Sequence, residues 1–222
     1  MRYGIIADVH GNLEALLSVM EALSGKADQV ICLGDIIGYG PNPNECCDII
    51  KKNQIISISG NHEKAVLGEM PIAWFNPSAA KAIHWTRAEL KLENIDFIKG
   101  LPPVLELDDF EIVHGSLAYP AEEYLENIFV AVPTFNLMTK PVLFVGHTHR
   151  PLVLNYAEKK IINPGSVGQP RDGDPRAAFG LIETDTMTFE FHRVEYDIHT
   201  AARRVVQAGL PEDLAWRLEK GK

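Results

Sequence analysis

Residues 3–10 read Tyr-Gly-Ile-Ile-Ala-Asp-Val-His, and a segment with apolar residues at helical spacing, 13–23, follows them. The short apolar run 3–7 predicts a buried strand, and the spacing in 13–23 predicts a helix. A second apolar run spans 29–33. Strand, helix and strand in this order predict two parallel strands joined by a crossover helix. This unit indicates an α/β fold.

Strands and helices continue to alternate beyond this unit. We expect helices at 44–52, 61–67, 77–91, 93–99, 198–208 and 212–219, and strands at 55–59, 104–107, 111–113, 142–145, 152–156, 161–162, 178–183 and 188–195. Two sheets packed face to face, with the helices outside, would satisfy this pattern. No repeat or linker interrupts it, so we expect one domain over residues 1–222.

Charge and cysteine content narrow the classes of function. The chain has 21 Lys and Arg against 30 Asp and Glu, a formal net charge of −9. This balance argues against general nucleic-acid binding, but it admits a small phosphorylated substrate, because bound metal ions reverse the local field. Cys32, Cys46 and Cys47 have no disulfide spacing, which favours a reducing compartment. We find no signal-peptide or transmembrane stretch and expect a cytoplasmic protein that does not contact membranes. The oligomeric state stays open.

Five short polar motifs each follow an apolar run that is typical of a strand. They are Asp8-Val9-His10, Gly34-Asp35, Gly60-Asn61-His62-Glu63, His114-Gly115 and Gly146-His147-Thr148-His149. Ligands of open α/β sheets bind where the strands end. Carboxylates, imidazoles and one amide are donors that suit divalent Mn, Fe or Zn. Each motif alone is ordinary, but together they predict a metal site.

The order of these motifs resembles the calcineurin-like metallophosphoesterase superfamily. Residues 163–171, Asn-Pro-Gly-Ser-Val-Gly-Gln-Pro-Arg, are similar to its small bacterial and archaeal branch of phosphodiesterases and phosphatases. The resemblance covers the chain to about residue 195. It implies a four-layer α/β/β/α sandwich of two mixed β-sheets flanked by helices, with a site for two divalent metal ions.

The resemblance also implies a role for each motif residue. Asp8, His10 and His149 would bind one metal ion, and Asn61, His114 and His147 would bind the other. Asp35 would bridge the two ions, and His62 would face the substrate as general acid. Besides His62, the residues expected to contact the substrate are Asn61 and Arg171.

The chemistry of such a site is the hydrolysis of a phosphomonoester or phosphodiester. A hydroxide that bridges two metal ions would attack the phosphorus, and His62 would protonate the leaving oxygen. No serine or cysteine nucleophile is needed, so we expect no covalent intermediate. Two alternatives are a nuclease of the same superfamily, which the acidic balance disfavours, and a catalytically silent metal-binding scaffold for partners. A scaffold would be expected to lose ligands or His62, and this sequence retains them all.

One segment departs from the pattern of the superfamily's protein serine/threonine phosphatases. Gly38 stands where those enzymes have the Asp that orients the catalytic histidine, and Tyr39 stands where they have a phosphate-binding Arg. Phosphoprotein phosphatase activity is therefore not expected. Glu63 or a backbone carbonyl could orient His62 instead. Tyr39 and Asn42 could line the rim of the pocket or be plain loop residues.

Two further segments have an ordinary and a functional interpretation. In 163–171, Ser166 and Arg171 could contact phosphate, or the segment could be a turn that closes the second sheet. Trp74 and Phe75 could form a lid or a partner surface, but we expect core packing. Residues 70–77 and 117–140 would shape the pocket, and they contain no motif that identifies the substrate.

Overall fold

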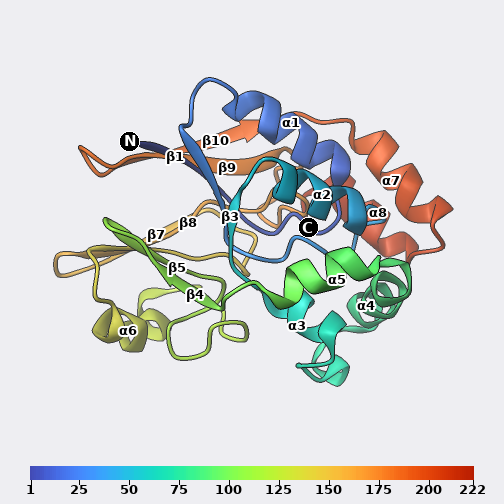
Figure 1. Ribbon diagram of the computed structural model, residues 1–222, viewed down its shortest axis with the longest axis horizontal. Coiled ribbons are helices and arrows are strands. Elements are labelled where there is room, and N and C mark those ends of the chain that lie inside the picture. Colours follow the sequence, from blue (N-terminus) through green and yellow to red (C-terminus); the bar gives the residue numbers. More distant parts are fainter.

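Two five-stranded mixed sheets form the centre of the protein in the computed structural model, which describes residues 1–222 (Figure 1). The first sheet has the order β10-β9-β1-β2-β3, with β1 (Arg2–Ile6), β2 (Gln29–Cys32), β3 (Ile56–Ser57), β9 (Ala177–Glu183) and β10 (Thr188–Val194). The second has the order β4-β5-β6-β8-β7, with β4 (Val104–Glu106), β5 (Phe110–Val113), β6 (Val142–Phe144), β7 (Leu152–Tyr156) and β8 (Lys159–Asn163).

Eight α-helices flank the sheets. They are α1 (Leu13–Leu23), α2 (Pro43–Lys52), α3 (Asn61–Leu67), α4 (Pro77–Glu89), α5 (Leu92–Lys99), α6 (Ile128–Leu137), α7 (Ile198–Gln207) and α8 (Glu212–Lys220), with a short 3₁₀ turn, η1, at Ile72–Trp74. Helix α1 connects the parallel strands β1 and β2, and α2 connects β2 to β3. The crossover unit expected from residues 3–33 is therefore present.

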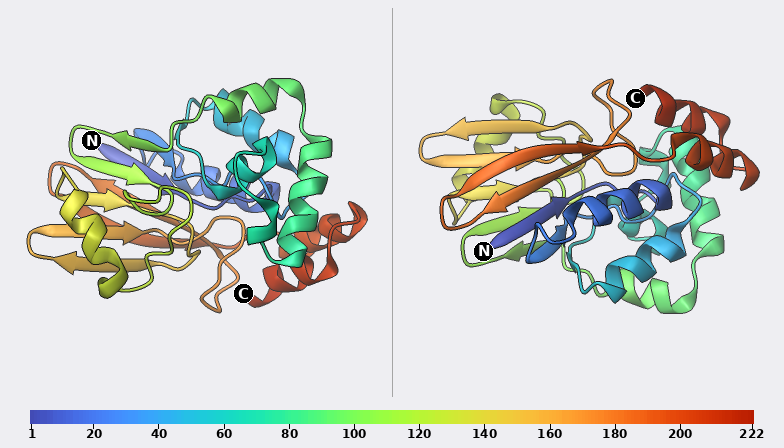
Figure 2. Two further views of the ribbon diagram at one scale, coloured as in Figure 1. Left: turned by 90° about the horizontal axis from the view of Figure 1, so that it is seen from below. Right: turned by 90° about the horizontal axis from the view of Figure 1, so that it is seen from above.

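Three apolar clusters separate the layers of the fold. Residues of both sheets, such as Ile5 and Phe110, pack together in the cluster between them. A larger cluster joins the first sheet to most of the helices. The third lies between the second sheet and α6, where Phe135 packs with Leu143. The expected four-layer α/β/β/α sandwich is confirmed, and Figure 2 shows its two stacked sheets with α6 beside the second.

The topology brings the carboxyl ends of several strands to one edge of the sandwich. Strands β1, β2 and β3 are mutually parallel in the first sheet, and β5, β6 and β8 are mutually parallel in the second. All five polar motifs follow these strands, and residues 163–171 begin at the last residue of β8. Parallel strands end at the same edge of a sheet, so the motifs meet there.

Helix α6 is an element that the sequence did not predict. Its interior holds Pro133, which removes one helical hydrogen bond and disfavours a helix. The Asn127 side chain caps the helix by accepting from the N–H groups of Phe129 and Val130 at 3.0 and 3.3 Å. Packing of its buried face against the second sheet outweighs the unfavourable proline. None of the helices combines the length and apolarity needed to cross a lipid bilayer.

Candidate metal centre

The structure brings together all seven side chains that the sequence proposed as metal ligands. They reach one buried site from the loops after β1, β2, β3, β5 and β6, and each is at most 8% exposed: Asp8, His10, Asp35, Asn61, His114, His147 and His149. Donor atoms of Asp8, His10, Asp35 and His149 lie within 4.8 Å of one another, as do those of Asp35, His114 and His147. Asp35 belongs to both groups.

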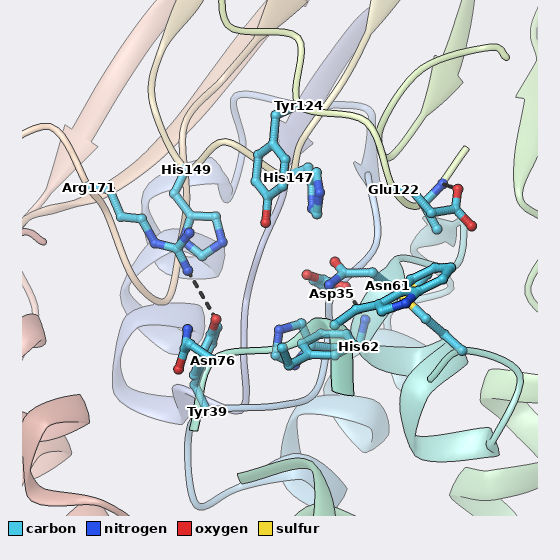
Figure 3. Close-up of a pocket in the computed structure, with 14 residues that line it drawn as sticks. Asp35, Tyr39, Asn61, His62, Asn76, Glu122, Tyr124, His147, His149 and Arg171 are labelled. Carbon is cyan, nitrogen blue, oxygen red and sulfur yellow. Dashed lines mark hydrogen bonds between the residues drawn. The ribbon is translucent and has the colours of Figure 1, made fainter. Parts of the chain in front are cut away.

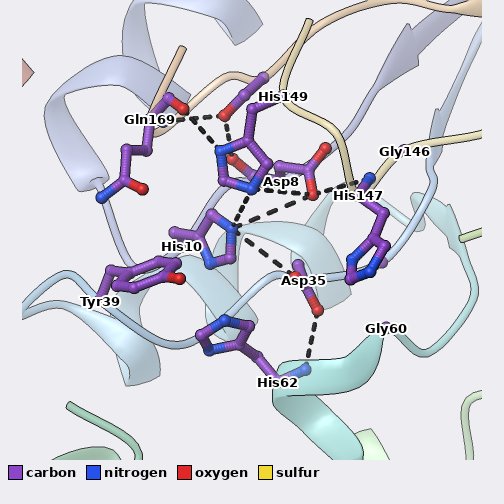
Figure 4. A network of polar contacts seen from close by, with 12 residues as sticks. Asp8, His10, Asp35, Tyr39, Gly60, His62, Gly146, His147, His149 and Gln169 are labelled. Carbon is purple, nitrogen blue, oxygen red and sulfur yellow. Dashed lines mark hydrogen bonds and ion pairs between the residues drawn. The ribbon is translucent and has the colours of Figure 1, made fainter. Parts of the chain in front are cut away.

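The first group contains two imidazoles whose nitrogens face each other (Figure 4). Nε2 of His10 lies 3.0 Å from Nε2 of His149. The Nδ1 atoms lie 3.2 Å from the carbonyl of Ile37 and 2.6 Å from that of Gln169, respectively. A carbonyl only accepts, so each Nδ1 carries the hydrogen and each Nε2 presents a lone pair. Two lone pairs at this distance repel unless a cation lies between them.

The second group repeats this arrangement. Nδ1 of His114 donates to the carbonyl of Leu33 at 2.8 Å, so its Nε2 is the nitrogen that presents a lone pair once the ring is deprotonated. That Nε2 lies 3.1 Å from Nδ1 of His147 and 3.2 Å from Oδ1 of Asn61. Hydrogen bonds that fix the tautomer of a ligating histidine in this way are a regular feature of metal sites.

Asp35 lies between the two groups. Its Oδ2 atom is 3.6 Å from Nε2 of His10 and 3.4 Å from Nε2 of His114. Its Oδ1 atom accepts from the backbone N–H of His62 at 3.0 Å. The Oδ2 atom of Asp35 therefore lies near a histidine of each group.

Five of the seven candidate ligands have left-handed backbones. The φ angles are 54° at Asp8, 51° at His10, 53° at Asp35, 69° at His147 and 59° at His149. A residue with a side chain in this region costs roughly 1–2 kcal/mol. Such strain persists where surrounding contacts over-determine the geometry, and it concentrates at functional sites. Here it aims the ligand side chains of three of the five motifs, those after β1, β2 and β6, into the centre.

Burial of so many ionisable groups makes the site unfavourable without cations. Burial, together with the neighbouring Asp35, raises the pKa of Asp8 to about 7, although the charge of His114 opposes this shift. Burial lowers the pKa of His10 and His149 well below the usual range. Burial also opposes protonation of His114, yet the adjacent Asp35 raises its pKa to about 9. The donor set fits divalent metal ions, which would supply the missing positive charge.

Glu63 connects two of the ligand loops. Its buried carboxylate accepts from the backbone N–H groups of Asp35 at 2.9 Å, Ile37 at 3.1 Å and Gly60 at 2.8 Å. The loop after β2 is thus tied to the start of α3. Glu63 does not orient the His62 ring, which was one of the two options that the sequence suggested.

His62 is held by packing. No hydrogen-bond partner is present for its buried Nδ1 atom, so the carbonyl suggested as the other option is also absent. A side chain at Gly38 would overlap this nitrogen. The ring contacts those of His10, Tyr39 and Phe75, with centroids 4.7, 4.6 and 5.3 Å apart. Burial lowers the pKa of His62 to about 4, while Asp35 opposes this shift.

A pocket of about 330 Å³ opens over the centre, and His62 and Arg171 line it (Figure 3). The Arg171 guanidinium donates to Oε1 of Gln169 at 3.0 Å and to the hydroxyl of Tyr39 at 3.3 Å. The positive charge of Arg171, which lies in the loop after β8, is therefore beside Tyr39. Tyr39 stands where the protein serine/threonine phosphatases have a phosphate-binding Arg. Asn42, the other residue considered for the rim, does not line this pocket.

One expectation, core packing of Trp74, was wrong, and one alternative that the sequence left open, contact of Ser166 with phosphate, is not supported by the structure. Ser166 is buried and donates to the carbonyl of Asp8 at 2.8 Å, so it supports the ligand loop and does not face the pocket. Trp74 is 69% exposed and lines the pocket, in contrast to the expected core packing, whereas Phe75 lines the pocket and also packs against the large apolar cluster. Reasoning from sequence also missed Tyr124, whose ring stacks on that of His147 at 3.7 Å, because no motif surrounds it.

Known proteins share the sequence features that form this candidate metal centre. Residues 1–187 match the calcineurin-like phosphoesterase superfamily domain. The chain belongs to this superfamily. An uncharacterized protein of Methanocaldococcus jannaschii is 38% identical, with 98% of this chain and 97% of that protein covered. Phosphodiesterase YfcE of Escherichia coli is 26% identical, with 85% and 90% covered.

A solved structure supports the same assignment. The metallophosphoesterase of Sphaerobacter thermophilus is 40% identical, covers 100% of both chains and superposes with a TM-score of 0.92. This calcineurin-like protein is therefore a metal-dependent phosphoesterase, and its clustered Asp and His side chains form a site that can bind metal.

Proposed function

We propose that this phosphoesterase holds two divalent ions and hydrolyses a diester bond of a small phosphorylated substrate. The observation that carries the proposal is the position of Asp35, whose Oδ2 lies between His10 and His114. Asp8, His10 and His149 would hold one ion, and Asn61, His114 and His147 the other. Bound ions, whether Mn, Fe or Zn, would supply Lewis acidity toward the phosphoryl oxygens and acidify water.

His62 is the proposed general acid. Its Nδ1 is buried against Gly38, which leaves Nε2 to give a proton to the leaving oxygen. An anionic phosphoryl group in the pocket would favour the protonated ring, as Asp35 does. The residues that line the pocket include no serine, threonine or cysteine. Direct hydrolysis without a covalent intermediate is therefore the proposed course.

Arg171 and Asn61 are the proposed substrate contacts. Arg171 is the only Lys or Arg among the residues that line the pocket, and the carboxylate of Glu122 lies across from it. One cation opposed by a carboxylate suits a singly charged diester better than a doubly charged monoester. The name of the relative YfcE, a phosphodiesterase, supports the same preference. The three free, buried cysteines support a cytoplasmic location.

Hydrolysis of two chromogenic esters tests this function. Metal-stripped protein would be supplied with Mn²⁺, Fe²⁺, Zn²⁺ or Mg²⁺ and assayed with bis-p-nitrophenyl phosphate and p-nitrophenyl phosphate. We expect metal-restored activity with the diester preferred, and its loss in His62→Ala and Asp35→Ala. His84→Ala removes an exposed histidine outside the site and serves as control. Stoichiometric metal binding without hydrolysis of either ester would support the silent scaffold instead.

A further inference from the structure

The segment that contains η1 carries an unexpected apolar surface. Trp74 is 69% exposed, and it lines the same pocket as His62. Met70 and Phe75 line this pocket as well. Ligand pockets combine apolar walls with a few polar groups. The aromatic side chains beside the metal centre therefore indicate that part of the ligand is apolar.

The aromatic wall begins at the proposed general acid. The ring of Phe75 meets that of His62 edge to face, with centroids 5.3 Å apart and an interplanar angle of 81°. In the proposed reaction the leaving oxygen lies beside His62. A group attached to that oxygen would therefore extend along Phe75 toward Trp74.

The charged side chains of the pocket also distinguish a side for the phosphoryl group from a side for the leaving group. In Figure 3, Arg171 and Glu122 lie on opposite sides of the pocket. The exposed Glu122 carboxylate accepts from the N–H of the preceding residue, Ala121, at 3.1 Å. The Arg171 side suits anionic oxygens, whereas the Glu122 carboxylate disfavours an anionic leaving group. The group on the aromatic side is therefore expected to be uncharged.

The pocket already holds aromatic rings in stacked contact. The Tyr124 ring lies 3.7 Å from the His147 ring with an interplanar angle of 25°, and Tyr124 remains 46% exposed. A volume of about 330 Å³ accommodates a phosphoryl group and one ring system.

We infer that Met70, Trp74 and Phe75 form a subsite for an uncharged, planar aromatic leaving group. The substrates would then be phosphodiesters whose leaving alcohol carries an aromatic ring system. This inference rests on the proposed function, because it needs a phosphoryl group at the metal centre. It adds recognition of the leaving group by the segment that follows α3.

Two non-hydrolysable ligands test the subsite apart from catalysis. They are the monomethyl esters of 2-phenylethylphosphonic and 2-cyclohexylethylphosphonic acid, which carry the same charge and differ in the planarity of the ring. Affinities for Mn²⁺-loaded protein would be measured by calorimetry. We expect the phenyl compound to bind roughly threefold to tenfold more tightly, since aromatic contacts add to apolar burial.

The variants make this result specific. Trp74→Ala and Phe75→Leu should bring the ratio of affinities close to one. The control Trp216→Ala truncates another exposed tryptophan, on α8 and outside the pocket, and should leave the ratio unchanged. Trp74 is exposed, so its truncation is not expected to impair folding.

Three results would overturn the inference. They are equal affinity of the parent for both ligands, no binding of either, and a ratio that Trp74→Ala does not alter. A change of oligomeric state in Trp74→Ala with an unchanged ratio would assign Trp74 to a partner surface. The assay with p-nitrophenyl esters reports separately on the proposed function, so hydrolysis with equal ligand affinities would reject the subsite alone.

Discussion

The buried carboxylate of Glu63 accepts a hydrogen bond of 2.9 Å from the backbone N–H of Asp35, the residue between the two histidine groups. The same carboxylate accepts from Gly60 at 2.8 Å, and Asp35 in turn accepts from the N–H of His62 at 3.0 Å. These reciprocal bonds hold the loop after β2 against the start of α3. Glu63 thus positions Asp35 and belongs to neither candidate group of metal ligands.

We expect Glu63→Gln to weaken metal binding roughly 10- to 100-fold, as loss of a supporting contact to a ligand does. The amide loses one acceptor and places its NH₂ near a backbone donor, so the free energy of unfolding should fall by about 1–3 kcal/mol. Mn²⁺ titration and chemical denaturation measure the two effects.

A second buried glutamate supplies the control for this variant. Glu111 accepts from the backbone N–H groups of Thr139 and Lys140 at 3.1 and 3.3 Å, and it does not belong to the candidate metal groups. Glu111→Gln should lower stability by a similar amount while Mn²⁺ affinity stays at the parent value. Equal losses of Mn²⁺ affinity in both variants would remove the specific role of Glu63.

Gly38→Ala should impair catalysis and spare metal binding. The new methyl group would overlap Nδ1 of His62 and displace the ring, since no hydrogen bond holds this nitrogen in place. Removal of a general acid lowers rates by about 10²–10⁴, so we expect kcat for bis-p-nitrophenyl phosphate to fall at least roughly tenfold.

The backbone strain of this substitution needs its own control. Gly38 has a φ of +92°, and Gly25 has a φ of +70° with open space around it. Gly25→Ala should lose about 1 kcal/mol of stability and no activity. A kcat in Gly38→Ala equal to that of the parent would show that activity does not depend on the position of the His62 ring. This result would contradict the role of His62 as general acid.

Metal binding should release protons and strengthen as pH rises. In the metal-free protein the pKa of His114 is raised to about 9 by Asp35, against burial, and burial raises that of Asp8 to about 7. Both groups must be deprotonated to bind a cation. At pH 7 His114 is therefore protonated before binding, and affinity should fall as pH falls from about 9 to 5.

Calorimetry in buffers with different ionisation enthalpies counts these protons. We expect at least about one proton released per chain at pH 7 when Mn²⁺ binds. His84→Ala should release the same number, because His84 lies outside the site. Mn²⁺ binding without proton release, at an affinity that is the same at pH 6 and pH 8, would contradict the charge states described for His114 and Asp8.

Arg171→Ala should raise KM for bis-p-nitrophenyl phosphate by roughly tenfold or more and change kcat less. The reason is that loss of a charge-assisted hydrogen bond removes about 1.5–3 kcal/mol of binding free energy. Arg171→Lys should recover only part of this loss, because an ammonium cannot reproduce the planar guanidinium contacts to Gln169 and Tyr39. Steady-state kinetics measure KM and kcat of both variants. Arg203→Ala, on the exposed face of α7, is the control. An unchanged KM in Arg171→Ala would show that the substrate does not contact Arg171.

Much of the fold and of the candidate site could be predicted because both are encoded locally. The helix at 13–23 was predicted with its observed ends, since its apolar spacing is regular and Asn12 caps it. The seven candidate ligands could be found because each follows an apolar strand, and parallel strands end at the same edge.

The remaining features depend on contacts between distant residues. Nothing near Tyr124 in the sequence indicates that its ring stacks on His147. Ser166 reaches the carbonyl of Asp8 from 158 residues away. The exposure of Trp74 follows from where η1 lies over the centre, whereas its sequence context resembles that of a core residue. Helix α6 was missed because Pro133 disfavours the helix that tertiary packing then stabilises.

The number of metal ions per active chain tests the central claim most directly. Metal-stripped protein would be titrated with Mn²⁺, and bound metal and hydrolysis of bis-p-nitrophenyl phosphate would be measured in the same samples. We predict two ions per chain at full activity, with little activity when one is bound, and a joint loss of the second ion and of activity in Asp35→Asn. Full activity with a single ion per chain would contradict a centre in which Asp35 joins two.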